Sequence, residues 1–168
     1  MNETELTGKA HKFGDDINTD YIIPGKYLMK ITDDDKLAEH AMEGVDPNFR
    51  DKADPGDFIV AGDNFGSGSS REEAPTVIKH ADVSAVLAKS FARIFYRNAV
   101  NIGLPIIECD TDEIDQGDEL YVNLEEGVLK DVDRDKEIEI SPLPPEMSKI
   151  LEDGGLVAHL DKHGTFNL

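Results

Sequence analysis

The order of apolar and amphipathic segments in the middle of the sequence predicts an α/β fold. Apolar strands are expected at 57–62 ("DFIVAG"), 83–90 ("VSAVLAKS") and 104–109 ("LPIIEC"), and helical patterns separate them. Strands joined through helices pair in parallel, with right-handed crossovers. We therefore expect a single domain over residues 1–168, with a mostly parallel β-α-β-α-β core and antiparallel strands added at both ends.

The segments before the core predict a strand, a turn and a helix. A first strand is expected at 5–13, and a polar turn leads to an apolar run that bends at Pro24 and Gly25. Residues 32–44 form a helical pattern. Thr32 or Asp33 can cap this helix, acidic residues fill its first turn, and Gly44 is expected to stop it.

Two helices are expected inside the core. Residues 71–81 form the first, with Pro75 near its first turn, where a missing N–H costs least. Residues 91–103 form the second, an amphipathic segment that ends at Gly103.

The C-terminal third predicts two half-exposed antiparallel strands and one helix. Apolar and polar residues alternate at 119–125 and 136–141, as in strands with one solvated face. A helix that starts with proline and stops at glycine is expected at 144–155. His159 and His163 then fall in a polar tail, where we expect a surface pair.

Composition narrows the class of protein. The 168 residues carry 17 basic and 36 acidic side chains, a formal net charge of −19, which disfavours binding to nucleic acid. No apolar run approaches the ~20 residues that cross a bilayer. The N-terminal residues lack the basic and apolar regions of a signal peptide, so a cytoplasmic protein without membrane contact is expected.

Cysteine and histidine usage gives no metal site in this chain. Cys109 is the single cysteine, so an internal disulfide and a multi-thiolate zinc or iron–sulfur site are excluded. Cys109 follows a predicted strand, and we expect a structural thiol. The five histidines show no convincing pattern of metal ligands.

The stretch "GDNFGSGSSREEAP" (62–75) lies between a predicted strand and a predicted helix. Unpaired N–H groups at a helix start favour an anion, and glycines let the backbone approach it closely. Arg71 adds a fork suited to a carboxylate or phosphate. A loop that merely caps the helix through Ser69 or Ser70 is an equally good interpretation of these residues alone.

Three better-known loop motifs do not fit this stretch. A P-loop needs a lysine after its second glycine, and a dinucleotide fingerprint needs a third glycine where Arg71 stands. A hydrolase elbow needs glycine two places before and after its serine, which Ser67, Ser69 and Ser70 all lack.

Three long blocks carry a resemblance to a known family. The stretch 62–75, the later "AKSFARIFYRNAVNIGLPII" (88–107) and the early "GDDINTDYIIP" (14–24) occur in family order at family-like spacing. Together they resemble the small subunits of the isopropylmalate dehydratase branch of the aconitase superfamily. The similarity runs over nearly the whole chain.

The resemblance implies a fold, a partner and a reaction. The fold would be the swivelling domain of aconitases, with β/β/α layers. It would close over a separate large subunit that carries a [4Fe–4S] cluster, whose iron acts as a Lewis acid on the substrate. The reaction implied is the isomerisation of a hydroxy-dicarboxylate by loss and re-addition of water, most simply of 2-isopropylmalate to 3-isopropylmalate in leucine biosynthesis.

The resemblance also implies the site residues. Carried over by position, Ser69 takes the proton from carbon, while Gly68, Ser70 and Arg71 bind the substrate carboxylate. If the serine pKa resembles the ~15.7 of water, ionising the hydroxyl near pH 7 costs about 12 kcal/mol. A helix N-terminus offers at most ~2 kcal/mol. A desolvated, closed site must supply much of the rest, so the isolated chain is expected to be inactive.

The resemblance places substrate choice in the loop 24–30, where homoaconitate enzymes carry arginine in place of Met29. Methionine packs against alkyl groups and cannot pair with a carboxylate, which predicts an apolar substituent. Isopropylmalate is the first choice, and methylated malates such as citramalate or 2,3-dimethylmalate are alternatives. Homoaconitate stays open because Lys30 is adjacent.

Other motif residues are expected to support the loop. Asp15, Asn18, Thr19 and Asp20 fit a polar turn held by side-chain hydrogen bonds better than direct catalysis. Lys89, Ser90, Arg93 and Arg97 fit packing or helix-surface roles at least as well as contact with substrate or partner. An alternative of another class is an anion-binding module without catalysis, which a cluster-bearing partner would argue against.

Overall fold

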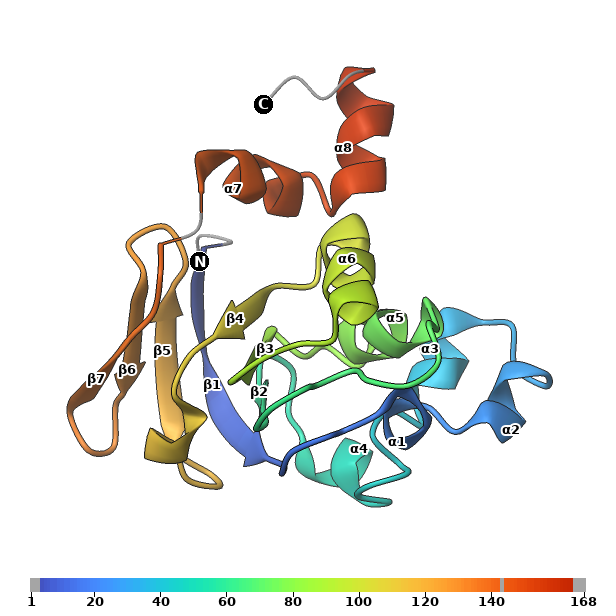
Figure 1. Ribbon diagram of the computed structural model, residues 1–168, viewed down its shortest axis with the longest axis horizontal. Helices are drawn as coiled ribbons and strands as arrows, with labels where there is room; N and C mark the ends of the chain where they lie inside the picture. Colours follow the sequence, from blue (N-terminus) through green and yellow to red (C-terminus); the bar gives the residue numbers. More distant parts are fainter. Residues whose placement is uncertain (1–3, 143, 165–168) are drawn as a thin grey trace.

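A single mixed sheet organises the molecule. The computed structural model describes residues 4–142 and 144–164, and in that part of the chain seven strands follow the order β4-β3-β2-β1-β5-β6-β7 (Figure 1). The strands are β1 (Glu5–Lys12), β2 (Phe58–Val60), β3 (Ala85–Ala88), β4 (Ile106–Glu108), β5 (Glu119–Asn123), β6 (Val128–Asp131) and β7 (Lys136–Glu139).

One half of the sheet is parallel, as the sequence predicts. β1 pairs with β2, β2 with β3, and β3 with β4, all in parallel, with Ala10 opposite Phe58 and Phe58 opposite Ala85. All four residues of β3 are buried. Burial on both faces explains why this strand reads as a continuous apolar run.

The other half is antiparallel and contains one strand that the sequence patterns missed. β5 pairs with β1, β6 with β5, and β7 with β6. In β6 only Leu129 and Asp131 are buried, so a short segment with one buried apolar residue gives almost no hydrophobic signal.

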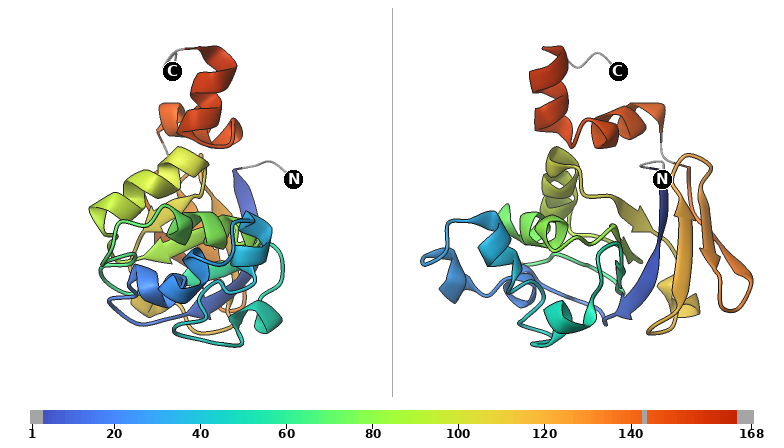
Figure 2. Two further views of the ribbon diagram at one scale, coloured as in Figure 1. Left: turned by 90° about the vertical axis from the view of Figure 1, so that its right-hand side faces the viewer. Right: turned by 180° about the vertical axis from the view of Figure 1, so that it is seen from behind.

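The two halves and the helices form three layers, so the expected β/β/α arrangement is confirmed. One apolar core joins three helices to one face of the parallel strands through residues such as Ile59 and Val86. The helices are α3 (Asp34–Ala38), α5 (Glu73–His80) and α6 (Arg93–Ile102). A second core packs the opposite face, including Phe58 and Leu87, against Leu120 and Leu129 of the antiparallel half. Figures 1 and 2 show these helices on the side of the parallel strands away from β5, β6 and β7.

The helices are short. They are α1 (Thr19–Ile22), α2 (Gly25–Leu28), α3 (Asp34–Ala38), α4 (Phe49–Lys52), α5 (Glu73–His80), α6 (Arg93–Ile102), α7 (Pro145–Glu152) and α8 (Leu156–His163), with a 3₁₀ turn, η1, at Thr111–Glu113. In the described parts of the chain, none of them combines the length and apolar character that crossing a bilayer requires.

The helix expected at 32–44 is wrong in its extent. Asp33 caps α3 by accepting from the Lys36 N–H, as predicted, but the helix ends at Ala38. Beyond it, the Met42 N–H donates to the Ile22 carbonyl and the Gly44 N–H to the Tyr21 carbonyl. A Cβ on Gly44 would lie 2.6 Å from the Tyr21 Cα, so this glycine permits a close backbone approach.

Residues 156–163 also form a helix, contrary to the expected polar tail. α8 follows α7 after a turn at Gly154 and Gly155, and it packs against α6 and α7. Gly103 ends α6 in the left-handed conformation (φ 79°), as predicted, and its position leaves no room for a Cβ beside Gly154. His159 is 1% exposed, so the expected surface pair with His163 is wrong.

Candidate active site

The glycine–serine loop, which we define as residues 62–71, leaves the carboxyl end of β2 and leads to α5. The segment 14–20 lies alongside it: the Gly66 N–H donates to the Ile17 carbonyl (2.7 Å) and the Thr19 N–H to the Ser67 carbonyl (2.8 Å). Two segments far apart in sequence thus hold each other through backbone bonds. The early motif supports the loop as a polar turn, as expected, with Asn18 Oδ1 accepting from the Tyr21 N–H.

A second support comes from the end of β3. The Asn64 N–H donates to Ser90 Oγ (2.8 Å), and the Phe65 N–H donates to the Ser90 carbonyl (3.0 Å). Phe65 itself is fully buried, edge-on to the ring of Phe95 at 5.2 Å. The loop is therefore clamped from both sides of its first half.

Gly66 is a glycine that this packing requires. Its φ is +84°, and a Cβ at this position would lie 2.3 Å from Cγ of Phe95. Residues with a side chain rarely adopt this backbone conformation, and the ring of Phe95 leaves no space for a Cβ. The loop can run this close to α6 only because residue 66 has no side chain.

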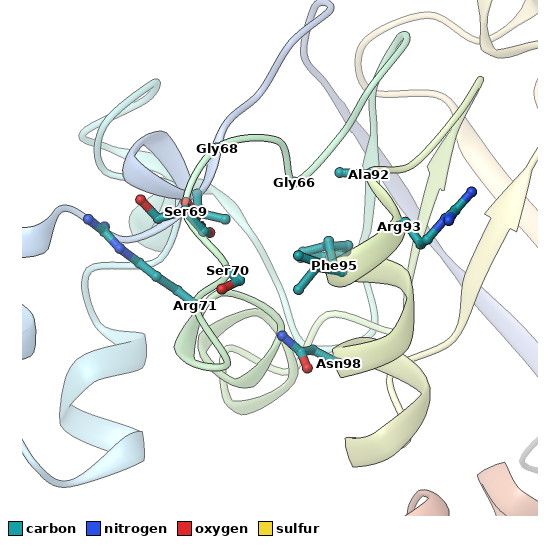
Figure 3. Close-up of a pocket in the computed structure, with 11 residues that line it drawn as sticks. Gly66, Gly68, Ser69, Ser70, Arg71, Ala92, Arg93, Phe95 and Asn98 are labelled. Atoms are coloured by element: carbon teal, nitrogen blue, oxygen red, sulfur yellow. Dashed lines mark hydrogen bonds between the residues drawn. The ribbon is translucent and has the colours of Figure 1, made fainter.

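A cavity of about 180 Å³ opens between the loop and the first turns of α6. It is lined by Thr19, Gly66, Gly68, Ser69, Ser70, Arg71, Ala92, Arg93, Ile94, Phe95 and Asn98. Four residues assigned to the site from the sequence, Gly68, Ser69, Ser70 and Arg71, therefore lie together (Figure 3).

Gly68, Ser69 and Ser70 are exposed and line this opening, and no hydrogen bond to another described residue is formed by their N–H groups or by the two hydroxyls. The backbone carbonyl of Ser69 is occupied instead, since it accepts from Thr19 Oγ1 (3.0 Å) and from the Arg71 N–H (2.9 Å). Capping of α5 through Ser69 or Ser70 is wrong: the N-cap residue is Glu72, and it makes no side-chain capping bond.

The guanidinium of Arg71 is held against the segment that precedes α2. Its Nη1 donates to Asp20 Oδ1 and to the Ile23 carbonyl, both at 3.0 Å. In Figure 3 the side chain points away from the space between Ser70 and Asn98. The hydrogen bond from Arg71, helped by the Gly25 N–H, holds the pKa of Asp20 below its usual value.

Other cations and Met29 lie outside or at the edge of the cavity. Met29 is 94% exposed at the end of α2, and neither it nor Lys30 lines the cavity. Arg93 lines it at an exposed position, whereas Arg97 does not. Lys89 donates to Asp112 Oδ2 (2.7 Å), which raises the pKa of the lysine, so it belongs to a surface ion pair.

Phe95 and Asn98 were missed by the sequence patterns. They face the cavity from successive turns of α6, three residues apart on one side of the helix. The sequence predicts 91–103 only as an amphipathic helix, without indicating which side faces the loop. The close approach of Gly66 to Phe95 is a contact between distant segments, which the helical pattern does not contain.

The described residues hold no group of thiolates. Cys109 is largely buried, and burial, with a smaller effect of Asp110, raises its pKa to about 12. Two other groups bring potential cation ligands together: Asp118, Asp131 and Asp133, and Asp153, His159 and His163. The carboxylates of the first group are already paired with the guanidinium of Arg134. Its Nη2 lies 2.8 Å from Asp118 Oδ2, and its Nε lies 3.5 Å from Asp131 Oδ2.

The cavity can bind an anion, but it is chemically incomplete. It offers hydroxyls, loop N–H groups and nearby arginines, which together suit a small carboxylate. No histidine or carboxylate lines it among the described residues, so no group there is a ready base near neutral pH.

Comparison with known proteins agrees with the layered fold. The family of the aconitase C-terminal domain matches residues 14–111. The chain is 55% identical to 3-isopropylmalate dehydratase small subunit 2 of Archaeoglobus fulgidus, over 98% of this chain and 99% of that one. It is 51% identical to small subunit 1 of the same enzyme from Thermotoga maritima, over 96% and 98%.

A solved structure has the same fold over nearly its full length. The crystal structure of 3-isopropylmalate dehydratase (leuD) from Methanocaldococcus jannaschii superposes with a TM-score of 0.91 at 49% identity. The match covers 95% of each chain.

Proposed function

The chain belongs to the aconitase C-terminal domain family, and from this premise we propose that it is the small subunit of a 3-isopropylmalate dehydratase. The enzyme is a hydro-lyase of leucine biosynthesis that isomerises 2-isopropylmalate to 3-isopropylmalate by loss and re-addition of water. We place this reaction in the cytoplasm. We also propose that residues 1–168 form one swivelling domain, an interpretation supported by the sheet that both halves share.

One observation carries the proposal. The loop 62–71 brings Ser69 and Ser70 to an open cavity in a chain that matches a named small subunit over 98% of its length. A loop with only a structural role would use its hydroxyls within the chain, whereas here the backbone makes the structural bonds.

We assign the removal of the carbon-bound proton to Ser69. Ser69 is exposed, and its carbonyl already accepts from Thr19 Oγ1 and the Arg71 N–H while its hydroxyl has no partner among the described residues, so the side chain is free to meet a substrate. Ionising such a hydroxyl near pH 7 costs about 12 kcal/mol in water. This cost falls only when the cavity is covered and charge is stabilised by fixed donors, which requires a second protein surface.

We assign the binding of a substrate carboxylate to Gly68, Ser70 and Arg71. The N–H of Gly68 and the hydroxyl of Ser70 lie at the opening. Arg71 uses Nη1 for Asp20 and Ile23, which leaves the other edge of the guanidinium for a carboxylate. Asp20 then serves to position the arginine.

We propose that the covering surface is a large subunit with the [4Fe–4S] cluster of the family. The residues of this chain do not fit such a cluster, since Cys109 is the one cysteine and burial keeps it protonated. The roles proposed for Ser69, Ser70 and Arg71 are therefore those of one half of a shared active site.

The proposed substrate has an apolar substituent. Met29, at the exposed end of α2, offers a thioether that packs on an isopropyl group. Met29→Arg should raise kcat/KM for homoaconitate relative to 2-isopropylmalate by about 10-fold, because a new ion pair is worth about 1–2 kcal/mol. An unchanged ratio would remove Met29 from substrate selection, while Lys30→Ala tests the neighbouring ammonium in the same assay.

Reconstitution tests the proposed function. The chain is purified together with its large subunit under anaerobic conditions, and turnover is measured on 2-isopropylmalate, citramalate, 2,3-dimethylmalate and homoaconitate. The proposal expects the highest kcat/KM for 2-isopropylmalate. A higher value for another compound would change the assigned substrate, and no turnover of any of them by an intact complex would overturn the assigned reaction.

A further inference from the structure

The turn between α7 and α8 gathers two imidazoles on one carboxylate oxygen. Asp153 Oδ2 lies 2.6 Å from Nδ1 of His159 and 2.9 Å from Nε2 of His163. The two histidines are four residues apart on α8, so they share one face of the helix. The three facing atoms lie within 4.8 Å of one another.

This cluster is partly enclosed by the fold. The side chains of His159 and Asp153 are 1% and 8% exposed, whereas that of His163 is 40% exposed and borders an open cavity of about 350 Å³. Lys162 Nζ holds the other carboxylate oxygen, Oδ1, at 2.8 Å. Asp153 therefore turns Oδ2 toward the two rings, and solvent can reach that point from one side.

We propose that Asp153 Oδ2, His159 Nδ1 and His163 Nε2 form a binding site for a divalent first-row transition ion, of which Zn²⁺ is the representative. Two imidazole nitrogens and one carboxylate oxygen are the donor set that such ions prefer over Mg²⁺ or Ca²⁺. A fourth position would be taken by water from the open cavity. This site does not depend on the proposed function.

The three donor atoms must shift for an ion to enter. Ligand bonds of about 2.0–2.2 Å place neighbouring donor atoms about 3.0–3.5 Å apart. Oδ2 lies 2.6 Å from Nδ1 of His159 and 2.9 Å from Nε2 of His163, so these two distances grow by about 0.1–0.9 Å, and the two nitrogens, which lie within 4.8 Å of each other, adopt a similar separation. Both facing nitrogens must offer a lone pair, so protons in those positions pass to the other ring nitrogen or to solvent.

His80 also lies near two acidic side chains, but their atoms do not face one common point. His80 uses Nδ1 for Asp35 (2.8 Å), and its Nε2 lies 3.9 Å from Asp34. A single ring there bridges two exposed carboxylates on opposite nitrogens, and no common point lies within reach of three donors. His80 is thus a matched control for the histidines of α8.

A bound ion would connect α7 to α8. Asp153 is the residue that follows α7, and both histidines belong to α8. The turn between the helices rests on the end of α6, where Gly154 lies beside Gly103 (Figure 1). The ion would thus fix the C-terminal helices on the body of the domain.

Titration of the untagged full chain with Co²⁺ tests the site. After removal of metals with a chelator, the proposal expects saturable d–d absorption at one ion per chain, displaced by Zn²⁺ and unaffected by excess Mg²⁺. His163→Ala should weaken binding at least about 10–100-fold, the range found even for outer-shell partners of metal ligands. His80→Ala should leave the titration unchanged.

Thermal unfolding gives an independent readout. Zn²⁺ should raise the Tm of the wild-type chain and of His80→Ala, and it should raise that of His163→Ala much less. The proposal is overturned if no saturable binding occurs, or if His163→Ala binds Co²⁺ as tightly as the wild type. In either case the cluster is an ion pair between helices only.

Discussion

The two ends of strand β2 differ in whether their polar side chains have hydrogen-bond partners within the chain. At the amino end, Asp57 is 5% exposed and accepts hydrogen bonds from the Lys9 N–H (3.0 Å), the Asp54 N–H (2.9 Å) and His11 Nε2 (2.8 Å). All three donors belong to this chain, and the carboxylate is buried. We call this end of the strand the closed end.

At the carboxyl end, the loop 62–71 is held by hydrogen bonds of its backbone and not by the hydroxyls of Ser69 and Ser70. Backbone groups of residues 62–67 pair with the segment 14–20 and with Ser90, while the exposed residues Ser69 and Ser70 line the cavity. Ligands of α/β sheets bind at the carboxyl ends of the strands. At the loop 62–71, unlike at Asp57, backbone pairing supplies the rigidity. The serine side chains are therefore left for an external molecule.

Ser69→Ala should have the largest effect, because it removes the proposed base and no structural bond. In the reconstituted complex, kcat should fall about 1,000-fold, within the range for loss of a general base. Ser67→Ala is the matched control: its side chain does not line the cavity, so its kcat should stay near that of the wild type. Equal losses in the two variants would mean that the loop was disturbed in general.

Gly66→Ala should break the rigidity of this end. The added Cβ meets the ring of Phe95 at 2.3–2.6 Å, and φ is +84°. Overpacking together with left-handed strain predicts a loss of about 3 kcal/mol in the free energy of unfolding. Urea denaturation measures it against Gly14→Ala, where a Cβ meets nothing within 4 Å. A difference below about 1 kcal/mol between the two variants would contradict the tight packing.

Arg71→Lys should weaken the anion site without opening the fold. An ammonium cannot keep the bonds to Asp20 and Ile23 and also present a planar edge to a carboxylate. We expect kcat/KM to fall about 10–100-fold in steady-state assays. Asp20→Asn should cause a smaller loss through mispositioning of the arginine. A larger loss in Asp20→Asn than in Arg71→Lys would assign the direct role to the aspartate.

Asp57→Asn should weaken the closed end and change its response to acid. Burial raises the pKa of Asp57, but the hydrogen bonds from His11 and two N–H groups outweigh burial and lower it. The ionised group therefore stabilises the fold above its unfolded pKa of ~3.9, and this contribution is lost as the pH falls through the lowered value.

Urea unfolding at pH 7 should show a loss of about 1–3 kcal/mol for Asp57→Asn. Below about pH 4 the variant should approach the stability of the wild type. Asp51→Asn, at an exposed position, serves as the control. A constant difference between Asp57→Asn and the wild type at all pH values would contradict the assigned titration.

The sequence predicted the elements whose signals are local. β2, β3 and α6 have apolar periods that match their burial, and Gly103 marks the end of α6 because only a glycine fits its left-handed turn. The place of the loop between a strand and a helix predicted an anion site, which stays a prediction. Ser69 and Ser70 do line one cavity.

The remainder depends on contacts between distant segments. His159 is buried because α8 packs against α6, and the residues of α8 alone do not indicate that contact. Arg71 turns toward Asp20 because the early turn lies beside the loop. The loop from Met42 to Gly44 follows the α1 segment through backbone bonds to Tyr21 and Ile22. Such pairings leave no periodic trace in the sequence.

The central claim is that this chain holds one half of an active site, with Ser69 ready and the rest supplied by a partner. Its most direct test is a titration of the chain into a fixed amount of large subunit, with conversion of 2-isopropylmalate as the signal. The wild-type chain should be inactive alone and saturate activity at equal amounts. Ser69→Ala should give about 1,000-fold less activity and should inhibit by competing with the wild type for the partner. Turnover by the isolated chain, or turnover by the Ser69→Ala complex near that of the wild type, would contradict the claim.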